Sequence, residues 1–234
     1  MQDKVAATYL RRYEKARSHR LNFESLFDEC YEYALPQREG FTQLAAGQRR
    51  DDRIFDETAV VGVQEFASRL QSGLVPNFAR WADLVAGSEV PSDQTEAIDN
   101  QLEEVTEYVF QIMQNSNFGQ EAHEAFLDLA VGTGCLLVEE GDALNPVRFN
   151  AIPLPQLVLE NGADDRIDHV YRERKIRNSD ILIAYPDAII SEMLMDKILK
   201  EPDNKANMLE VVCRIYDKPN EEQNAYFVIC KDTR

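Results

Sequence analysis

The sequence predicts an α+β fold in which long N-terminal helices pack on a small, mostly antiparallel sheet. Three observations lead to this prediction. Before residue 132, apolar side chains recur at the three- and four-residue spacing of amphipathic helices. From residue 135 onward, short apolar runs separated by Pro, Asn and Gly predominate, which is typical of strands joined by turns. The segment 117–139 joins the two patterns, because it combines a helix, a Gly-Thr-Gly break and an apolar run.

The helix within 117–139 has a recognisable start and end. Asn117 is suited to cap it, with Gln120 in the reciprocal position of a capping box. Gly132 follows the last periodic residue and predicts a left-handed C-terminal cap, after which the run 135–138 predicts a central strand. The apolar stripe comprises Ala122, Ala125, Phe126, Leu129 and Ala130, whereas Glu121, Glu124 and Asp128 fall outside it.

The Gly132-Thr133-Gly134 break also invites a nucleotide-binding interpretation, because glycine-rich turns cradle phosphates. Phosphate loops, however, follow a strand and open a helix, and here the order is reversed. The segment 81–147 also contains no Lys or Arg that could face a phosphate. The break is therefore interpreted as structural, and a nucleotide-dependent enzyme is disfavoured.

The charge of the chain is unevenly distributed. The formal net charge is −17, and the segment 81–147 carries fourteen acidic residues and no basic ones. Residues 1–53 carry ten Lys or Arg against nine Asp or Glu. The acidic segment is either a solvated helical surface or a surface that repels polyanions or meets a basic neighbour, and composition does not choose between them.

Composition also bounds the class of protein. The 234-residue chain contains no apolar run near the roughly 18 residues of a membrane span, and its N-terminus lacks the hydrophobic region of a secretory signal. A soluble intracellular protein is expected. The four cysteines and three histidines are scattered without metal-ligand spacing, and no nucleophile lies near a base, so we expect reduced core thiols, no metal, no cofactor and no enzymatic activity. These residues are Cys30, Cys135, Cys213, Cys230, His19, His123 and His169.

The first helix is predicted over residues 3–35, where Pro36 ends it. Its apolar positions step by four and three, with Arg20 filling one place, and this 3.5-residue repeat predicts a long seam against another helix. Basic residues gather in its N-terminal half, which favours a solvated face over nucleic-acid contact because acidic residues follow on the same helix. The seam comprises Tyr9, Tyr13, Ala16, Phe23, Phe27, Cys30 and Ala34.

The loop 36–53 is the first candidate for a contact with another molecule. A connection this long is uncommon inside a compact domain unless it is functional or mobile. It ends in a basic cluster formed by Arg49, Arg50 and Arg53, which we single out as a candidate subunit or partner contact. A disordered loop tip is the equally weighted alternative.

Two more helices precede residue 117. Asp56 is suited to cap the second, which Pro76 ends, and Asp93 is suited to cap a third over 95–114 with a stripe at positions 98, 102, 105, 109 and 112. Between them, Trp81 is predicted to be a core anchor at the start of a short strand.

The segment after residue 146 is predicted to form strands and one helical stretch. Turn residues set the limits of these elements, and a hairpin is expected around 161–165. The expected strands are 147–152, 156–160, 167–175, 209–216 and 226–230, with a helical stretch over 178–200 and a loop over 201–207.

Three stretches together carry a resemblance to a known family. They are YEKARSHRLNFESLFDECYEYALP, FDETAVVGVQEFASRLQSGLVP and the RWADL that follows. Their order and spacing resemble the N-terminal portion of the head-to-tail connecting, or portal, proteins of short-tailed bacteriophages, over most of residues 9–175. The turn after the second helix departs from the family in lacking a second proline. The resemblance implies no catalytic residues.

The resemblance also implies an architecture and a set of partners. It implies a portal subunit in a homo-oligomeric, dodecameric ring at the portal vertex of the virion, made in the bacterial cytoplasm. Double-stranded DNA would pass through this ring during packaging and ejection, with weak and non-specific contacts, and no membrane would be involved. The packaging motor (terminase), tail-adaptor and capsid proteins would be its partners. A helical adaptor or scaffold protein of the virion without a DNA conduit is the alternative.

The family suggests a division of the chain as well. Residues 1–76 would form an N-terminal helical layer with the contact loop 36–53, and residues 77–234 an α+β, wing-like region. Because the apolar strand 226–230 is followed by only four residues that could cover it, we expect the fold to be incomplete at the C-terminus. The chain would then be the N-terminal part of a longer protein, truncated before the stem and the clip.

Overall fold

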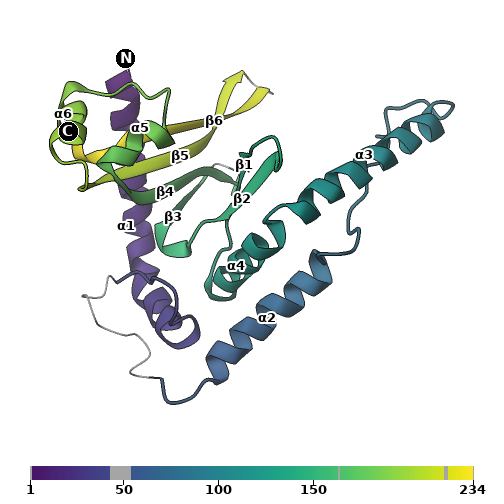
Figure 1. The fold of residues 1–234 in the computed structure, drawn as a ribbon, viewed down its shortest axis with the longest axis horizontal. Helices are drawn as coiled ribbons and strands as arrows, with labels where there is room; N and C mark the ends of the chain where they lie inside the picture. The colour runs from purple at the N-terminus through teal and green to yellow at the C-terminus, as the bar shows by residue number, and fades with distance from the viewer. Residues whose placement is uncertain (1, 43–53, 163, 219–220, 234) are drawn as a thin grey trace. The chain divides into compact units, whose positions relative to one another are not determined.

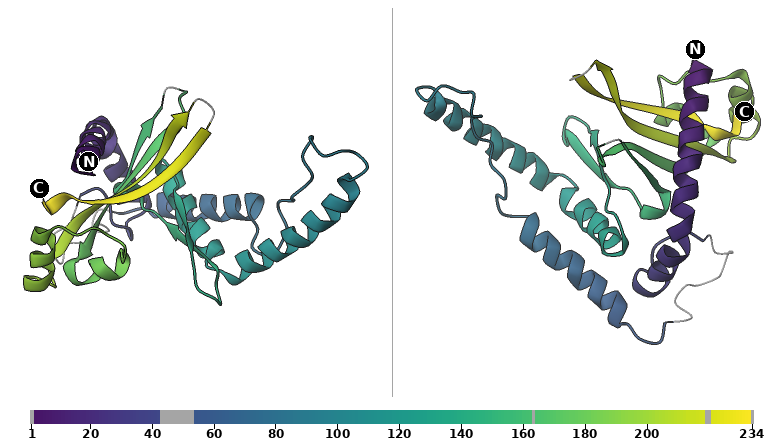
Figure 2. Two further views of the ribbon diagram at one scale, coloured as in Figure 1. Left: turned by 90° about the horizontal axis from the view of Figure 1, so that it is seen from above. Right: turned by 180° about the vertical axis from the view of Figure 1, so that it is seen from behind.

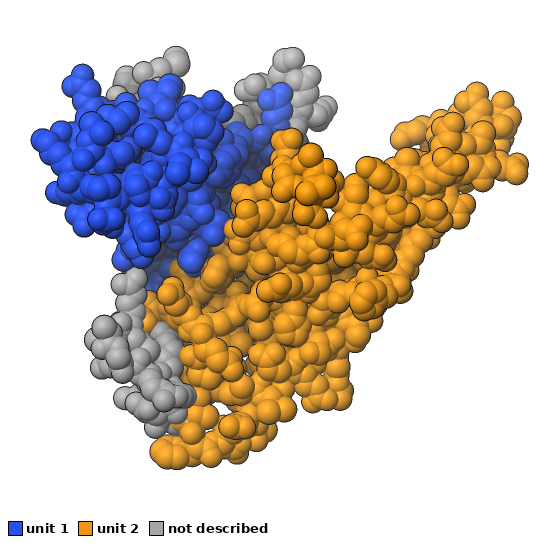
Figure 3. Space-filling view, viewed as in Figure 1, with its two compact units in different colours: residues 1–24, 156–234 blue, residues 25–155 orange. Residues whose placement is uncertain are grey.

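A computed structural model describes residues 2–42, 54–162, 164–218 and 221–233, and it confirms the α+β class (Figure 1). The chain forms two compact units, coloured separately in Figure 3. Unit 1 contains residues 1–24 and 156–234, and unit 2 contains residues 25–155. The family-based division at residue 76 stays a prediction.

Unit 1 is built on a four-stranded antiparallel sheet with the strand order β3-β4-β5-β6. The predicted hairpin around 161–165 is confirmed, since β3 pairs directly with β4. The predicted loop 201–207 is too long, because Lys205 already pairs with Arg177 at the start of β5. The strands are β3 Leu157–Asn161, β4 Ile167–Arg177, β5 Lys205–Lys218 and β6 Glu221–Cys230.

Both faces of this sheet are covered by helices. Helix α1 (Gln2–Ala34) lies along one face through its N-terminal half, and α5 (Ile181–Ala184) and α6 (Glu192–Lys200) cover the other, as the left view of Figure 2 shows. Alternate residues of β5 therefore serve different cores. The α1 side buries Tyr13, Val158, Tyr171, Leu209, Val211, Cys213 and Ile229, and the other side buries Ile181, Leu194, Ile198, Ala206 and Met208.

The predicted partner of the α1 seam was wrong. Tyr9, Tyr13 and Ala16 do lie on the inner side of α1, but they pack against strands and not lengthwise on another helix. Phe23, a predicted member of the seam, is half exposed. A pleated sheet face accepts a helical apolar stripe as well as a second helix does, so the spacing alone could not tell the two partners apart.

Unit 2 contains three helices and a two-stranded antiparallel sheet in its described residues, besides the C-terminal part of α1. Helix α4 is its centre, because α2, α3, β1 and β2 all contact it. These elements are α2 Thr58–Leu74, α3 Thr95–Asn115, α4 Phe118–Val131, β1 Leu136–Glu140 and β2 Val147–Ala151.

The predicted central strand was also wrong. The apolar run 135–138 lies mostly in β1, whose ladder pairs with β2 alone, from Leu136↔Ala151 to Glu140↔Val147. Val138 is consequently 60% exposed. The run is apolar enough for a buried strand, but the four-stranded sheet consists of β3 to β6 and does not include β1.

The two ends of α4 differ from the capping prediction. Asn117 makes no side-chain cap; instead its amide exchanges two hydrogen bonds with the backbone of Phe149, at 2.7 and 2.9 Å, and so fixes β2 to the helix. Gly132 has φ −164°, which is extended and not left-handed. Gly134 is the position in this break that requires glycine, because a Cβ atom there would lie 2.5 Å from the carbonyl oxygen of Ala125.

The buried sides of α3 and α4 are rotated relative to the predicted stripes. On α4, Asp128 is 1% exposed although its charge placed it outside the stripe, while Leu129 is exposed. On α3, Thr106 and Phe110 are buried, and Val105 is exposed.

Trp81 is not the predicted core anchor. Its side chain is 40% exposed, although its ring packs edge-on against Phe110 and parallel to Phe118. The expected strand is absent from residues 81–85, which form neither a helix nor a strand. The segment 81–85 is attached to α3 by a hydrogen bond from the backbone N–H of Leu84 to the side chain of Thr106.

Candidate functional site

The predicted contact residues Arg49, Arg50 and Arg53 lie outside the described residues. Across residues 2–42, 54–162, 164–218 and 221–233, no group of three or more His, Cys, Asp or Glu side chains is arranged to hold a metal ion. None of the four cysteines forms a disulfide. The structure does bring polar groups together in partly buried networks, which join helices to a sheet in unit 1 and two helices to each other in unit 2. It also leaves one face of α3 exposed.

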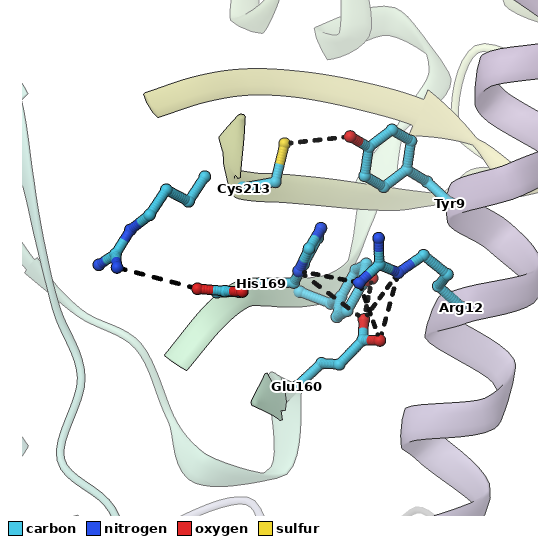
Figure 4. A network of polar contacts seen from close by, with 8 residues as sticks. Tyr9, Arg12, Glu160, His169 and Cys213 are labelled. Carbon is cyan, nitrogen blue, oxygen red and sulfur yellow. Dashed lines mark hydrogen bonds and ion pairs between the residues drawn. The ribbon is translucent and has the colours of Figure 1, made fainter. Parts of the chain in front are cut away.

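The first network joins α1 to β3 in unit 1 (Figure 4). Arg12 faces Glu160 with two nitrogens: Nε lies 3.2 Å from both carboxylate oxygens, and Nη2 lies 3.1 Å from Oε1. The hydroxyl of Tyr171 on β4 donates to the same carboxylate at 2.9 Å. Burial alone would raise the pKa of Glu160, but the hydrogen bonds from Arg12 and Tyr171 outweigh it and lower that pKa. Glu160 is therefore a fixed anion.

His169 completes this network in its neutral form. Its Nδ1 lies 3.4 Å from Nη2 of Arg12, and because a guanidinium can only donate, Nδ1 has to accept and the ring proton belongs on Nε2. Burial lowers the pKa of His169, and the positive charge of Arg12 lowers it further, against the opposing effects of Glu160 and Asp168. The register explains this grouping, since Glu160 and His169 are directly paired residues of β3 and β4.

A second contact on the same face attaches α1 to β5. The thiol of Cys213 donates to the hydroxyl of Tyr9 at 3.4 Å, and the ring of Tyr9 packs edge-on against Phe227. The hydrogen bond with Cys213 is the main reason why the pKa of Tyr9 rises to about 12. Tyr9 thus stays neutral and acts as an anchor.

Farther along the same helix, Tyr13 donates to Glu173 on β4 at 2.5 Å. Lys231 donates to the other oxygen of Glu173 at 2.6 Å, and its ammonium lies 4.8 Å from the centre of the Tyr13 ring. Burial raises the pKa of Glu173, but the hydrogen bonds from Lys231 and Tyr13 reverse the effect and lower it. The segment after β6 is thereby tied to α1.

The opposite face of the sheet holds its own buried carboxylate. Glu210 on β5 forms ion pairs with Arg172 at 3.3 Å and with Arg174 at 2.8 Å. Tyr185, which follows α5, donates to Glu210 at 2.6 Å. An acid within the apolar run 208–213 was a signal of a buried pair that sequence reasoning passed over.

Unit 2 contains a comparable network around Asp128. Its carboxylate accepts a hydrogen bond from the hydroxyl of Tyr31 and forms an ion pair with Arg38 at 2.5 Å. Arg38 also pairs with Glu124 and donates to the carbonyl oxygen of Glu124 at 3.0 Å. Burial raises the pKa of Tyr31, and the adjacent Asp128 charge raises it further. In each network the carboxylate is already engaged by cations and hydroxyls, which suits it to fixing the fold and not to proton transfer.

The exposed side of α3 differs from these networks, because it is both apolar and acidic. Val105, Tyr108 and Val109 are 47%, 64% and 40% exposed. Glu104 and Glu107 border them, and no basic residue occurs in the helix. We refer to these five residues as the α3 face. An exposed face that combines apolar and acidic side chains is a candidate for a contact with another molecule.

Comparison with known proteins adds two findings. A family model described as bacteriophage head to tail connecting protein matches residues 6–229. No curated protein matches the chain. Within the described residues, none of the helices is long and apolar enough to cross a membrane.

Proposed function

Since the chain belongs to the bacteriophage head to tail connecting proteins, a family of structural phage proteins that act at the junction of head and tail, we propose that it is a subunit of the portal ring. The match over residues 6–229 is the observation that carries this proposal. The subunit would assemble with copies of itself into a dodecameric ring at the portal vertex, after synthesis in the bacterial cytoplasm.

In this proposal the ring is a conduit through which DNA is packaged and ejected. A sliding polyanion is retained by every cation that contacts a phosphate, so an acidic or neutral surface suits passage better than a basic one. The segment 81–147, with fourteen acidic and no basic residues, meets that requirement. The protein would contribute no chemistry of its own; the packaging motor (terminase) would supply it.

The remaining parts of the proposal concern contacts. Arg49, Arg50 and Arg53 would act between subunits or on a partner, because they concentrate positive charge at the end of a long connection. Residues 1–76 would form the helical layer and residues 77–234 the wing-like region. The motor, tail-adaptor and capsid proteins would dock on the assembled ring in succession.

Negative-stain electron microscopy of the protein expressed from its complete phage gene tests the proposal. Rings with a central hole are the expected result. Discrete monomers would contradict it, and closed assemblies without a hole would favour the adaptor or scaffold protein that lacks a conduit.

A further inference from the structure

We propose that the α3 face docks on the basic outer side of α1 in a neighbouring copy of the chain. This inference rests on the proposed ring and names one of its subunit contacts. By the basic outer side of α1 we mean the exposed residues Arg11 and Lys15, which lie one helical turn apart and on the opposite side of the helix from the buried Tyr13.

The first argument is the spacing along α3. Ile98, Leu102 and Val105, followed by Val109 and Ile112, step by four and three, which marks a continuous packing surface along the helix. The side of α3 that unit 2 buries is a different one, marked by Thr106 and Phe110. Val105 and Val109, at the centre of the stripe, remain exposed, so the surface that covers them has to come from outside unit 2.

The second argument is charge, and it excludes a symmetric contact. If the α3 faces of two copies met each other, Glu104 and Glu107 would face the same acids of the partner helix. The segment 81–147 contains no Lys or Arg that could compensate, and Arg80, which directly precedes it, already pairs with Asp83 and Glu103. Like charges brought together in this way are destabilising. The α3 face must therefore bind a different surface, and a contact between two different surfaces of identical subunits is the kind that closes into a ring.

The third argument identifies the complementary surface. Two exposed basic residues of the other described helices already have an acidic partner in their own helix. Arg69 pairs with Glu65 at 2.5 Å, and Lys200 pairs with Asp196 at 2.9 Å. On α1, by contrast, Arg11 and Lys15 are exposed and form no ion pair with the described residues. Glu14 is the one acid among the exposed side chains of residues 11–19.

The two surfaces also fit in their apolar parts. The aliphatic stems of Arg and Lys cover apolar surface while their charged ends reach outward. Docked on the α3 face, the stems of Arg11 and Lys15 would cover Val105 and Tyr108, and their charged ends would meet Glu104 and Glu107.

A charge-swap experiment with protein from the complete phage gene tests this contact. One variant carries Glu104→Lys and Glu107→Lys, a second carries Arg11→Glu and Lys15→Glu, and a third combines all four changes. Light scattering after size-exclusion chromatography measures the ring fraction. In each of the two charge-reversed variants, the ring fraction should be at least tenfold lower than in the wild type at equal protein concentration. The combined variant should regain most of the wild-type ring fraction. A matched control, Glu139→Lys with Glu140→Lys, makes the same charge change on exposed residues of β1 and should assemble like the wild type.

The outcomes separate the contact from the ring. Wild-type rings together with normal rings in both reversed variants would overturn the contact and leave the proposed function standing. Loss of rings in both variants without recovery in the combined one would overturn the pairing of these two surfaces. Wild-type protein that never forms rings would overturn the proposed function, and the contact with it. Circular dichroism of each variant shows whether it is folded. If the variant with Glu104→Lys and Glu107→Lys is not folded, the milder pair Glu104→Gln and Glu107→Gln replaces it and should lose part of the ring fraction.

Discussion

Gly134 passes so close to α4 that a Cβ atom would lie 2.5 Å from the carbonyl oxygen of Ala125. The obstacle is backbone and cannot turn aside as a flexible side chain would. We therefore expect Gly134→Ala to lower the free energy of unfolding by about 1–3 kcal/mol through overpacking, measured by urea denaturation. Gly62→Ala is the matched control, since nothing lies within 4 Å of the added Cβ in α2, and it should stabilise by about 0.5–1 kcal/mol. Equal effects at both glycines would contradict this explanation.

Asp128 should be the carboxylate whose loss costs unit 2 most. Asp128→Ala leaves the partly buried Arg38 without one of its two carboxylates and Tyr31 without an acceptor, which is expected to lower the free energy of unfolding by about 3–5 kcal/mol. Asp196→Ala removes an exposed ion pair on α6 and should cost less than about 0.5 kcal/mol. Urea denaturation of both variants makes the comparison, and similar costs would show that burial of Asp128 carries no particular weight.

The network on Arg12 predicts a fall in stability with acid. The pKa of His169 is lowered from its ordinary 6.5 on folding, so as the pH falls below that value the unfolded chain takes up a proton before the folded one does. Stability is therefore fully present above about pH 6.5 and declines as the pH falls toward the folded pKa. His169→Gln should reduce the slope of urea midpoints between pH 7 and 5. Glu160, whose pKa is lowered from 4.5, adds a further loss at lower pH. An unchanged slope in the His169 variant would show that this ring does not contribute.

The arginine cluster predicted from the sequence can be tested separately. Replacing Arg49, Arg50 and Arg53 together with alanine should reduce ring formation and leave the thermal midpoint nearly unchanged, because the proposed role is in assembly. Size-exclusion chromatography with light scattering and a thermal scan measure the two quantities. Normal rings from the triple variant would reject the role.

DNA binding should be weak and insensitive to sequence. The net charge of −17 repels a polyanion, and the conduit proposed for the ring requires sliding and not retention. A gel-shift assay with two unrelated duplexes at physiological salt should show no complex below micromolar protein. Submicromolar binding would be incompatible with this expectation.

Local sequence signals predicted where several elements end and which strands pair, but they did not predict which side of each helix is buried. The ends of α1 and α2 follow from Pro36 and Pro76, and the β3–β4 hairpin follows from turn residues. The charge of Asp128 excludes it from an apolar stripe, and its burial depends on Tyr31, which lies 97 positions earlier. No periodicity reveals such a distant hydroxyl. Similarly, the α1 spacing did not distinguish a sheet from a helix as its partner.

The anchoring of α1 sets an order of events during synthesis. The contact between Tyr9 and Cys213 spans 204 positions, and the core around Tyr13 needs Leu209, Val211 and Ile229. At roughly 5–20 residues per second, about 10–40 s pass between emergence of α1 from the ribosome and emergence of β5. All of unit 2 is made within that interval and can fold first. Until β5 and β6 emerge, the apolar residues of the N-terminal half of α1 lack the strands that bury them in the folded protein, so we expect this half of the helix to be the part of the nascent chain most prone to aggregate.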